Sequence, residues 1–428
     1  MATTPPRVSL TGYLLIAACA LATGVRAAPV EPLLSLAAKE KPALLDTLKD
    51  LVSIESGSRD LEGLDKLAGL IAGRLKDLGG QVELLEAGAD LYKMHDTPDK
   101  VGKMVRATFP GTGTKKILLL AHMDTVYLKD MLAKQPFRIE GNRAYGLAIA
   151  DDKQGIALIL HAVAILKAVG FDEYGALTVL INGDEEISSP GSRGLLTRLG
   201  SEHDAVFSME ASRAESDKLE LTTSGIASVS LTMHGRASHA GQAPEKGVNA
   251  LVELSHQIMQ TLDLSEPATG VKMNWTLATA GSNRNVIPAL ANATADVRVL
   301  RVADYDRIEQ RVRERIKNQL LPEAKVELNF ERRRPPLEAT EASRAMGKHA
   351  QQIYRELGKE LVVDEVTVGG GTDAAFAALD TKGPVIERVG LQGYGAHTAD
   401  AEYVLTDSIE PRLYLLTRLI MDVSGGKS

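Results

Sequence analysis

The order of strand-like and helix-like segments is the feature that most constrains how this chain can fold. Short strand patterns lie near 81–85, 103–109, 115–121 and 175–182, and a helical pattern at 153–168 lies between the last two. This alternation predicts α/β layers, with helices on both faces of a mixed, largely parallel sheet. The same style returns after Pro335-Pro336, with a helix near 341–357, strands near 361–366 and 384–388, and a C-terminal helix from about 407.

A different pattern occupies the middle of the chain. Alternating apolar and polar residues begin near 227–234, and the order from there to 330 is strand, helix, two strands, helix, strand. That order predicts a ferredoxin-like α+β unit. We therefore expect an α/β domain split into 28–223 and 335–428, with an inserted domain at 224–334. Such an insertion is physically reasonable when the ends of the insert lie close together.

Residues 1–27 are expected to be an export signal. Arg7 precedes an apolar stretch near 13–22, and the small residues around Ala27 fit cleavage by signal peptidase. The stretch is too short to span a membrane comfortably. An alternative is a lipoprotein box ending at Cys19, which would anchor the protein through a lipid. With ordinary cleavage the protein is periplasmic or secreted and has no cysteine, so any metal must be held by His, Asp and Glu.

Charge and motif content exclude two classes of protein. The net charge is -7, and the densest basic run is only Arg332-Arg333-Arg334, so nucleic acid is not an expected partner. A Gly-x-Ser-x-Gly elbow is absent from the sequence, which argues against a serine hydrolase of that type.

Acidic and imidazole side chains gather where the predicted strands end. His122 and Asp124 follow one strand, and Glu185 and Glu186 follow another. In extended chain, neighbouring side chains point to opposite faces, so the two glutamates can take different roles, whereas His122 and Asp124 share a face. Imidazole is a common metal ligand, and a carboxylate within reach can fix its tautomer. We therefore expect His122 to bind a metal and Asp124 to orient it.

Three further candidates are weaker when each is taken alone. Asp151 lies at a strand-to-helix turn, Glu210 follows an apolar strand, and His397 lies in a glycine-rich loop. Their ordinary roles would be a helix N-cap, a surface turn acid and a loop histidine. Taken together, the three residues indicate a ligand site more strongly, because all lie at strand ends or in flanking loops, where α/β proteins bind their ligands.

Six motifs give the chain a resemblance to a known family. They are Ala-His-Met-Asp-Thr-Val-Tyr (121–127), Ala-Asp-Asp-Lys (150–153), Asp-Glu-Glu (184–186), Arg-Ala-Ser-His-Ala-Gly (236–241), Asn-Val-Ile-Pro (285–288) and Gly-Gly-Gly-Thr-Asp-Ala-Ala (369–375). From about 40 to 424 the chain resembles the dizinc metallopeptidases that include aminoacylases, diaminopimelate desuccinylase and glutamate carboxypeptidases. The resemblance is strongest to the glutamate carboxypeptidases. The resemblance implies a zinc exopeptidase-like fold that holds two zinc ions per chain.

The resemblance also implies a set of metal ligands. His122 and Glu210 would complete one zinc site, and Glu186 and His397 would complete the other. Asp151 would bridge the two ions. All five donors are nitrogen or oxygen, which suits zinc and tolerates cobalt or manganese.

Further roles follow for residues beside these ligands. Glu185 would be the general acid/base, Asp124 would orient His122, and the Asp151-Asp152 peptide bond would be cis. The sequence departs from the family pattern at two glycine positions, which Ala148 and Gln154 occupy. These replacements put in doubt the backbone geometry beside the bridging aspartate, and with it the rate or specificity.

The inserted domain would serve as a lid and a dimerisation domain. His239 and Asn285 resemble residues that reach across a homodimer interface and stabilise the oxyanion in the neighbouring site. Arg298 and Arg334 resemble residues that bind the terminal carboxylates of the substrate, and Gly370 would supply a backbone donor nearby. Without the resemblance, His239 would be a turn histidine, Asn285 a strand-end asparagine and Arg298 a surface strand cation.

The resemblance therefore implies a secreted dizinc exopeptidase that releases a C-terminal amino acid. Glutamate from folate-like or N-acyl-glutamate substrates is the expected product. One alternative is a dipeptidase or N-acyl-amino-acid amidohydrolase with the same site. Another is a non-catalytic periplasmic binding protein, which predicts missing ligands, whereas all five are present.

Overall fold

The computed structural model describes Met1 and residues 28–87, 91–367, 369–398 and 402–427. The expected cleavage site at Ala27 and the alternative lipidation site at Cys19 lie outside these residues. Within the described ranges, the chain contains no helix with the length and apolar character needed to cross a bilayer.

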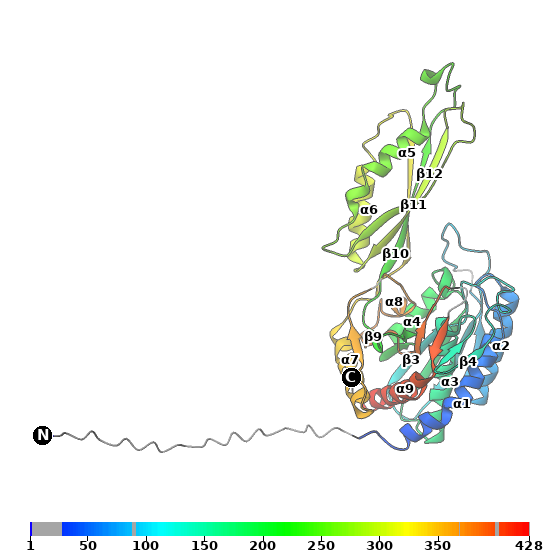
Figure 1. Ribbon diagram of the computed structural model, residues 1–428, viewed down its shortest axis with the longest axis vertical. Coiled ribbons are helices and arrows are strands. Elements are labelled where there is room, and N and C mark those ends of the chain that lie inside the picture. The colour runs from blue at the N-terminus through cyan, green and yellow to red at the C-terminus, as the bar shows by residue number, and fades with distance from the viewer. Residues whose placement is uncertain (2–27, 88–90, 368, 399–401, 428) are drawn as a thin grey trace.

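A six-stranded sheet forms the centre of the α/β part (Figure 1). Its order is β1-β2-β6-β3-β7-β15, in which β6, β3, β7 and β15 run parallel. At one edge, β2 pairs antiparallel with β6, and β1 pairs antiparallel with β2. The strands are β1(Gln81–Leu85), β2(Met104–Pro110), β3(Lys116–His122), β6(Ala176–Asn182), β7(Ala205–Ser208) and β15(Val385–Ile386). The predicted mixed, largely parallel sheet is confirmed.

Helices cover both faces of this sheet because β3 is apolar on both sides. Ile117 and Leu119 join one hydrophobic core, whereas the alternating residues Leu118 and Leu120 join another. The first core includes residues from α1(Leu33–Val52), α2(Leu61–Asp77), α3(Gln154–Ala168), α7(Glu341–Glu356) and α9(Ile409–Ser424). The second includes residues from α4(Arg193–Glu202) and α8(Ala374–Ala377).

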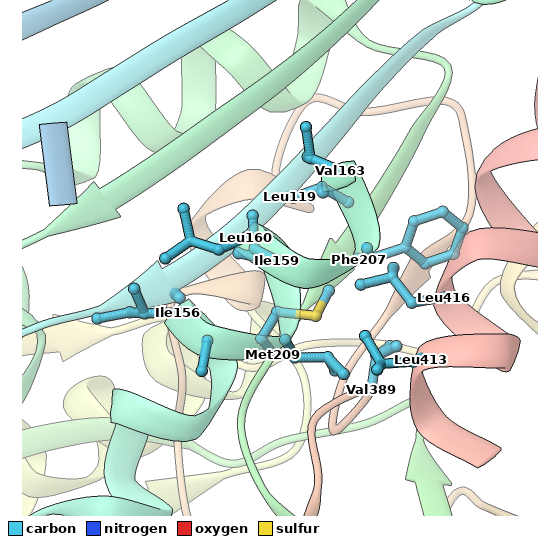
Figure 2. Packing of buried hydrophobic residues seen from close by; sticks show 14 of the residues in the cluster. Leu119, Ile156, Ile159, Leu160, Val163, Phe207, Met209, Val389, Leu413 and Leu416 are labelled. Carbon is cyan, nitrogen blue, oxygen red and sulfur yellow. The ribbon is translucent and has the colours of Figure 1, made fainter. Parts of the chain in front are cut away.

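Figure 2 shows how the larger core is filled between the sheet and two helices. Side chains of β3 and β7 meet those of α3 and α9, and fourteen members of the cluster are drawn. The labelled residues are Leu119, Ile156, Ile159, Leu160, Val163, Phe207, Met209, Val389, Leu413 and Leu416. This packing fixes α3, whose N-terminal end adjoins the Asp151 turn.

Two smaller sheets join segments that are distant in the sequence. The larger has the order β4-β5-β17-β16-β8, and β14 pairs in parallel with β9. The strands are β4(Arg138–Glu140), β5(Arg143–Tyr145), β8(Ser212–Arg213), β9(Lys218–Glu220), β14(Val362–Asp364), β16(Gln392–Tyr394) and β17(Tyr403–Leu405). The strand predicted near 361–366 corresponds to β14. The other strands of these two sheets were not predicted, because strands of two or three residues carry too little alternation to be recognised.

The inserted segment forms a separate antiparallel sheet with the order β11-β12-β10-β13. Its elements are β10(Gly225–His234), α5(Ala250–Met259), β11(Lys272–Ala280), β12(Leu290–Val299), α6(Ala303–Arg315) and β13(Lys325–Arg334). This sequence of elements and this strand order are those of a ferredoxin-like unit, as predicted. Ile226 pairs with Arg334, so the chain enters and leaves the insert at the same end of its sheet (Figure 1).

Candidate metal centre

Three of the predicted ligands lie at one edge of the central sheet. His122 is the last residue of β3, Glu210 lies two residues beyond β7, and Glu186 lies in the 3-10 turn η2(Glu185–Ile187) that follows β6. Because β3, β6 and β7 are parallel, their carboxyl ends meet at the same edge. The strand topology therefore gathers side chains that are up to 88 positions apart in the sequence.

The five predicted ligands form two groups that share Asp151. The ligand atoms of each group lie within 4.8 Å of one another. Nε2 of His122 lies 2.9 Å from Oδ1 of Asp151 and 3.4 Å from Oε1 of Glu210. Nε2 of His397 lies 3.2 Å from Oδ2 of Asp151 and 3.3 Å from Oε2 of Glu186. Asp151 thus presents a different oxygen to each group, and zinc binding by these residues stays a prediction.

The donor set fits two divalent cations. Within the described residues, Oε1 of Glu186 is buried and has no hydrogen-bond partner, as an oxygen that faces a cation would be. Burial and the charge of Asp151 raise the pKa of Glu186 to about 7. Hydrogen bonds to Asp151 and Glu186 raise the pKa of His397 to about 11. Burial is the larger cause for Glu186, whereas the neighbouring carboxylates are the cause for His397. Bound cations would offset the negative charge that contributes to both shifts.

Asp151 faces the two histidines and does not cap the following helix. It lies in the turn η1(Ile149–Lys153) before α3, and its peptide bond to Asp152 is cis, as predicted. The N-terminus of α3 has no side-chain cap. The alternative role of Asp151 as an N-cap is therefore wrong.

The two departures from the family pattern have different local effects. Gln154 donates hydrogen bonds to Oδ1 of Asp152 (2.6 Å) and to the carbonyl of Met209 (2.6 Å), and accepts one from the amide of Leu391 (2.5 Å). This side chain therefore ties the Asp151 turn to two other segments. Ala148 has a φ of 57°, a left-handed conformation that costs an L-residue about 1–2 kcal/mol.

Asp124 holds the turn that carries the two glutamates. Its Oδ1 accepts from the amide of Glu185 (2.9 Å), and its Oδ2 accepts from the amide of Glu186 (3.0 Å). Nδ1 of His122 lies 3.0 Å from the main-chain oxygen of Asp124 and 3.5 Å from Oδ1. The expectation of extended chain at the glutamates was wrong, because β6 ends before them, but the 3-10 turn still gives them different partners.

Glu185 is buried and paired with Arg334 of the insert. Nη1 of Arg334 donates to Oε1 of Glu185, and Nη2 donates to its main-chain oxygen (2.5 Å). Asp373 lies 3.5 Å from Nη1, and the arginine side chain is only 3% exposed. Burial raises the pKa of Glu185, and the charge of Arg334 opposes that shift. The predicted binding of a substrate carboxylate by Arg334 would therefore require this ion pair to separate.

Arg298 and Gly370 lie near one another on opposite sides of the boundary with the insert. The Arg298 guanidinium binds the carboxylate of Asp296 (2.9 and 3.1 Å) and donates to the carbonyl of Gly369 (2.9 Å). Gly370 is exposed, and its carbonyl accepts from the amide of Ser224 (2.8 Å). The Arg298 side chain is 29% exposed, so it is more accessible than Arg334.

His239 and Asn285 lie in loops at one end of the insert's sheet. Arg334, which contacts Glu185, lies at the other end. Nδ1 of His239 accepts from the amides of Gly241 and Gln242, both at 3.1 Å. Both residues belong to loops that follow the ends of β10 and β11, at the end of the sheet opposite Arg334. Their predicted role at a metal centre would therefore require these loops to come from a second subunit.

A third cluster of potential ligands is a poorer metal site. His95, Asp96 and Glu331 also have ligand atoms within 4.8 Å of one another. However, the guanidinium of Arg333 lies 2.9 Å from Asp96 and 2.7 Å from Glu331, so both carboxylates are already paired with a cation of the protein. The cluster joins the α/β part to the insert by ion pairs.

Two residues behind the metal groups were missed by the sequence analysis. The carboxylate of Glu402 accepts hydrogen bonds from the amides of Ala150 (2.8 Å) and Asp151 (3.1 Å). The hydroxyl of Tyr127 lies 2.5 Å from Oε2 of Glu402. One signal in the sequence pointed to each of them. Glu402 lies five residues after His397, and Tyr127 is the last residue of the 121–127 motif.

The chain is similar to two known enzymes over most of its length. The chain is 44% identical over 424 residues to Carboxypeptidase G2 of Pseudomonas sp. (strain RS-16), covering 99% of this chain and 100% of the relative. It is 28% identical over 405 residues to succinyl-diaminopimelate desuccinylase of Stenotrophomonas maltophilia (strain R551-3), covering 89% and 100% of the two chains.

A solved structure shows the same fold. The M20 family metallo-carboxypeptidase Sso-CP2 of Sulfolobus solfataricus superposes with a TM-score of 0.68 at 16% identity, covering 88% of this chain and 98% of that one. The family model described as Peptidase family M20/M25/M40 matches residues 118–422. The chain therefore belongs to peptidase family M20/M25/M40.

Proposed function

We propose that this peptidase is an exported dizinc metallo-exopeptidase that releases a C-terminal amino acid, with a preference for glutamate. The observation that carries the proposal is the sharing of Asp151 by two ligand groups beside the buried Glu185. Similarity to Carboxypeptidase G2 over the whole chain supports carboxypeptidase activity. The nitrogen and oxygen donors support zinc as the metal, with one ion in each group.

The reaction would be hydrolysis of an amide, in which water adds to the carbonyl and the amine leaves. Zinc ions in the two groups would polarise the scissile carbonyl and make a water molecule more acidic. Glu185 would accept a proton from that water and donate it to the leaving nitrogen. Asp124 would keep Glu185 in place through its hydrogen bond to the Glu185 amide.

A cavity beside the metal groups has room for a small substrate. It has a volume of about 460 Å³, and its lining includes Glu186 and Tyr127. Arg59 and Lys129 also line it, and these cations would favour an acidic substrate. Arg298 is the better exposed of the two predicted carboxylate-binding arginines, so it is the candidate that we propose for glutamate selection.

Substrate profiling with the zinc-loaded enzyme tests this proposal. We expect kcat/KM to be highest for pteroyl-glutamate, lower when another residue replaces the glutamate, and lower still for N-acetyl amino acids. Arg298→Gln should raise KM for the glutamate substrate by about 10-fold or more, as loss of a charged hydrogen bond of about 1.5–3 kcal/mol implies. It should have little effect on a substrate ending in leucine.

Two other profiles would contradict the glutamate assignment. Turnover only of dipeptides with a free amine would indicate a dipeptidase. A preference for N-acyl amino acids without regard to the C-terminal residue would indicate an amidohydrolase, an outcome that the likeness to the desuccinylase makes worth testing. Absence of turnover on all these substrates, with both zinc ions bound, would favour a binding protein.

We also propose that the protein is a homodimer formed through the insert. β11 is an edge strand of the described sheet, and Leu277 on it is 68% exposed. An exposed apolar edge strand is a ready site for pairing with another chain. Sedimentation at micromolar concentration should give the mass of two chains, and a fully active monomer would contradict the proposal.

Export is proposed from the pattern in residues 1–27 alone. N-terminal sequencing of the protein recovered from outside the cytoplasm should begin at Ala28. A mature chain that begins with lipid-modified Cys19 would instead establish the lipoprotein alternative, and an intact N-terminus would contradict export.

A further inference from the structure

Glu402 supports the backbone of the ligand that the two metal groups share. Its side chain is buried, with 1% of the residue exposed. Oε1 of Glu402 accepts hydrogen bonds from the consecutive amides of Ala150 and Asp151. These amides belong to the turn that orients both oxygens of Asp151, so Glu402 holds this turn through its backbone.

Tyr127 connects Glu402 to the loop that carries His397. Its hydroxyl lies 2.5 Å from Oε2 of Glu402 and 2.7 Å from the carbonyl of Thr398, the residue after His397. Gln135 donates a second hydrogen bond to the same carbonyl, at 3.1 Å. The single proton of the Tyr127 hydroxyl can be donated to one of these two acceptors at a time, and the hydroxyl lies within hydrogen-bond distance of both. Tyr127 therefore links the carboxylate that holds the Asp151 turn to the His397 loop.

His397 needs such support more than the other histidine does. The side chain of His397 is 56% exposed, whereas that of His122 is 3% exposed. His122 is the last residue of a buried strand, but His397 lies in a loop and has a φ of 65°. Burial in the strand and the contact of Nδ1 with the main-chain oxygen of Asp124 both hold His122. His397 lacks that burial, so its position depends more on hydrogen bonds made by its loop.

We propose that Glu402 and Tyr127 are positioning residues that set the affinity of the ion held by Asp151, Glu186 and His397. The inference rests on the proposed dizinc centre and adds to it the residues that hold its more exposed half. Neither residue belongs to a ligand group, and both act through the backbone of ligand-bearing segments.

Zinc titration of purified variants against a competing chelator tests the proposal. Tyr127→Phe removes only the hydroxyl, so one zinc should bind as in the parent and the other 10–100-fold more weakly, the usual effect of losing an outer hydrogen-bond partner. Glu402→Met leaves the amides of Ala150 and Asp151 without their acceptor, so it should weaken the ion held by Asp151, Glu186 and His397 as well. Because Asp151 belongs to both ligand groups, the other ion should also bind more weakly in this variant.

Glu402→Gln is the conservative variant and should restore near-parental binding. Its carbonyl oxygen can accept from the two amides, while its amide group donates to Tyr127, whose hydroxyl then donates to Thr398. Two matched controls should bind zinc as the parent does. Tyr174→Phe alters a buried tyrosine elsewhere, and Glu253→Met alters a buried glutamate that accepts from the amide of Leu321.

The outcomes separate this inference from the proposed function. If the parent does not bind two zinc ions, the dizinc centre itself is wrong. If the parent binds two, and folded Tyr127→Phe and Glu402→Met also bind two with unchanged affinity, the positioning role is overturned. Should Glu402→Met fail to fold, Tyr127→Phe alone decides between these results.

Discussion

Replacement of Glu185 by glutamine is expected to reduce kcat by about 10³-fold, because an amide cannot accept the proton of the attacking water. General acid–base residues typically contribute 10²–10⁴-fold. Zinc content should stay unchanged, since Glu185 belongs to neither ligand group. The fold should also persist, because the glutamine oxygen can still accept from Arg334. Steady-state kinetics and zinc analysis of the same preparation would measure both effects.

A conservative change at a buried glutamate of the insert provides the control. Glu253→Gln should leave kcat unchanged, because Glu253 lies on α5 of the insert and contacts Gln257 and Leu321. Normal turnover by Glu185→Gln would remove Glu185 from the mechanism. Loss of zinc by that variant would instead place Glu185 among the ligands.

Asp151→Asn is expected to weaken the binding of both zinc ions, each by more than about 100-fold. The substitution removes a negative charge and leaves one oxygen where the structure uses two, one toward each histidine. Loss of a mere outer hydrogen-bond partner costs 10–100-fold, and loss of a direct ligand should cost more. Elemental analysis after gel filtration would measure the zinc retained per chain.

Two variants test whether the effect belongs to the shared ligand. Asp152→Asn changes the adjacent buried carboxylate, which lies outside both groups, and should retain two zinc ions. Glu210→Gln changes a ligand of one group and should retain one tightly bound ion. Retention of both ions by Asp151→Asn would show that Asp151 does not bridge.

The elements of the fold that carry a strong local pattern could be predicted from the sequence. The helical spacing of Leu64, Leu67 and Ile71 corresponds to α2, and the order of elements in the insert is as expected. α1 was not predicted, and it contains Pro42, which ordinarily signals the end of a helix. The short strands of the five-stranded sheet are stabilised by pairing with distant segments, which no local pattern reports.

The metal groups were accessible from the sequence for a related reason. His122, Glu186 and Glu210 each follow an apolar strand, and parallel strands bring such positions to one edge. The family resemblance, and not the spacing of the residues, predicted that these three ligands share metal groups with Asp151 and His397. Contacts such as Arg334 with Glu185 join chain positions 149 residues apart, so they became visible only in three dimensions.

Arg334 is the last residue of β13, whereas Glu185 follows a strand of the other sheet, so their ion pair spans the boundary between the two sheets. A swing of the insert that drew the guanidinium away would increase the basicity of the carboxylate. A ligand that bound without moving the insert would meet the Glu185 carboxylate still paired with the Arg334 guanidinium. The orientation of one sheet and the proton affinity of a side chain on the other are thereby linked.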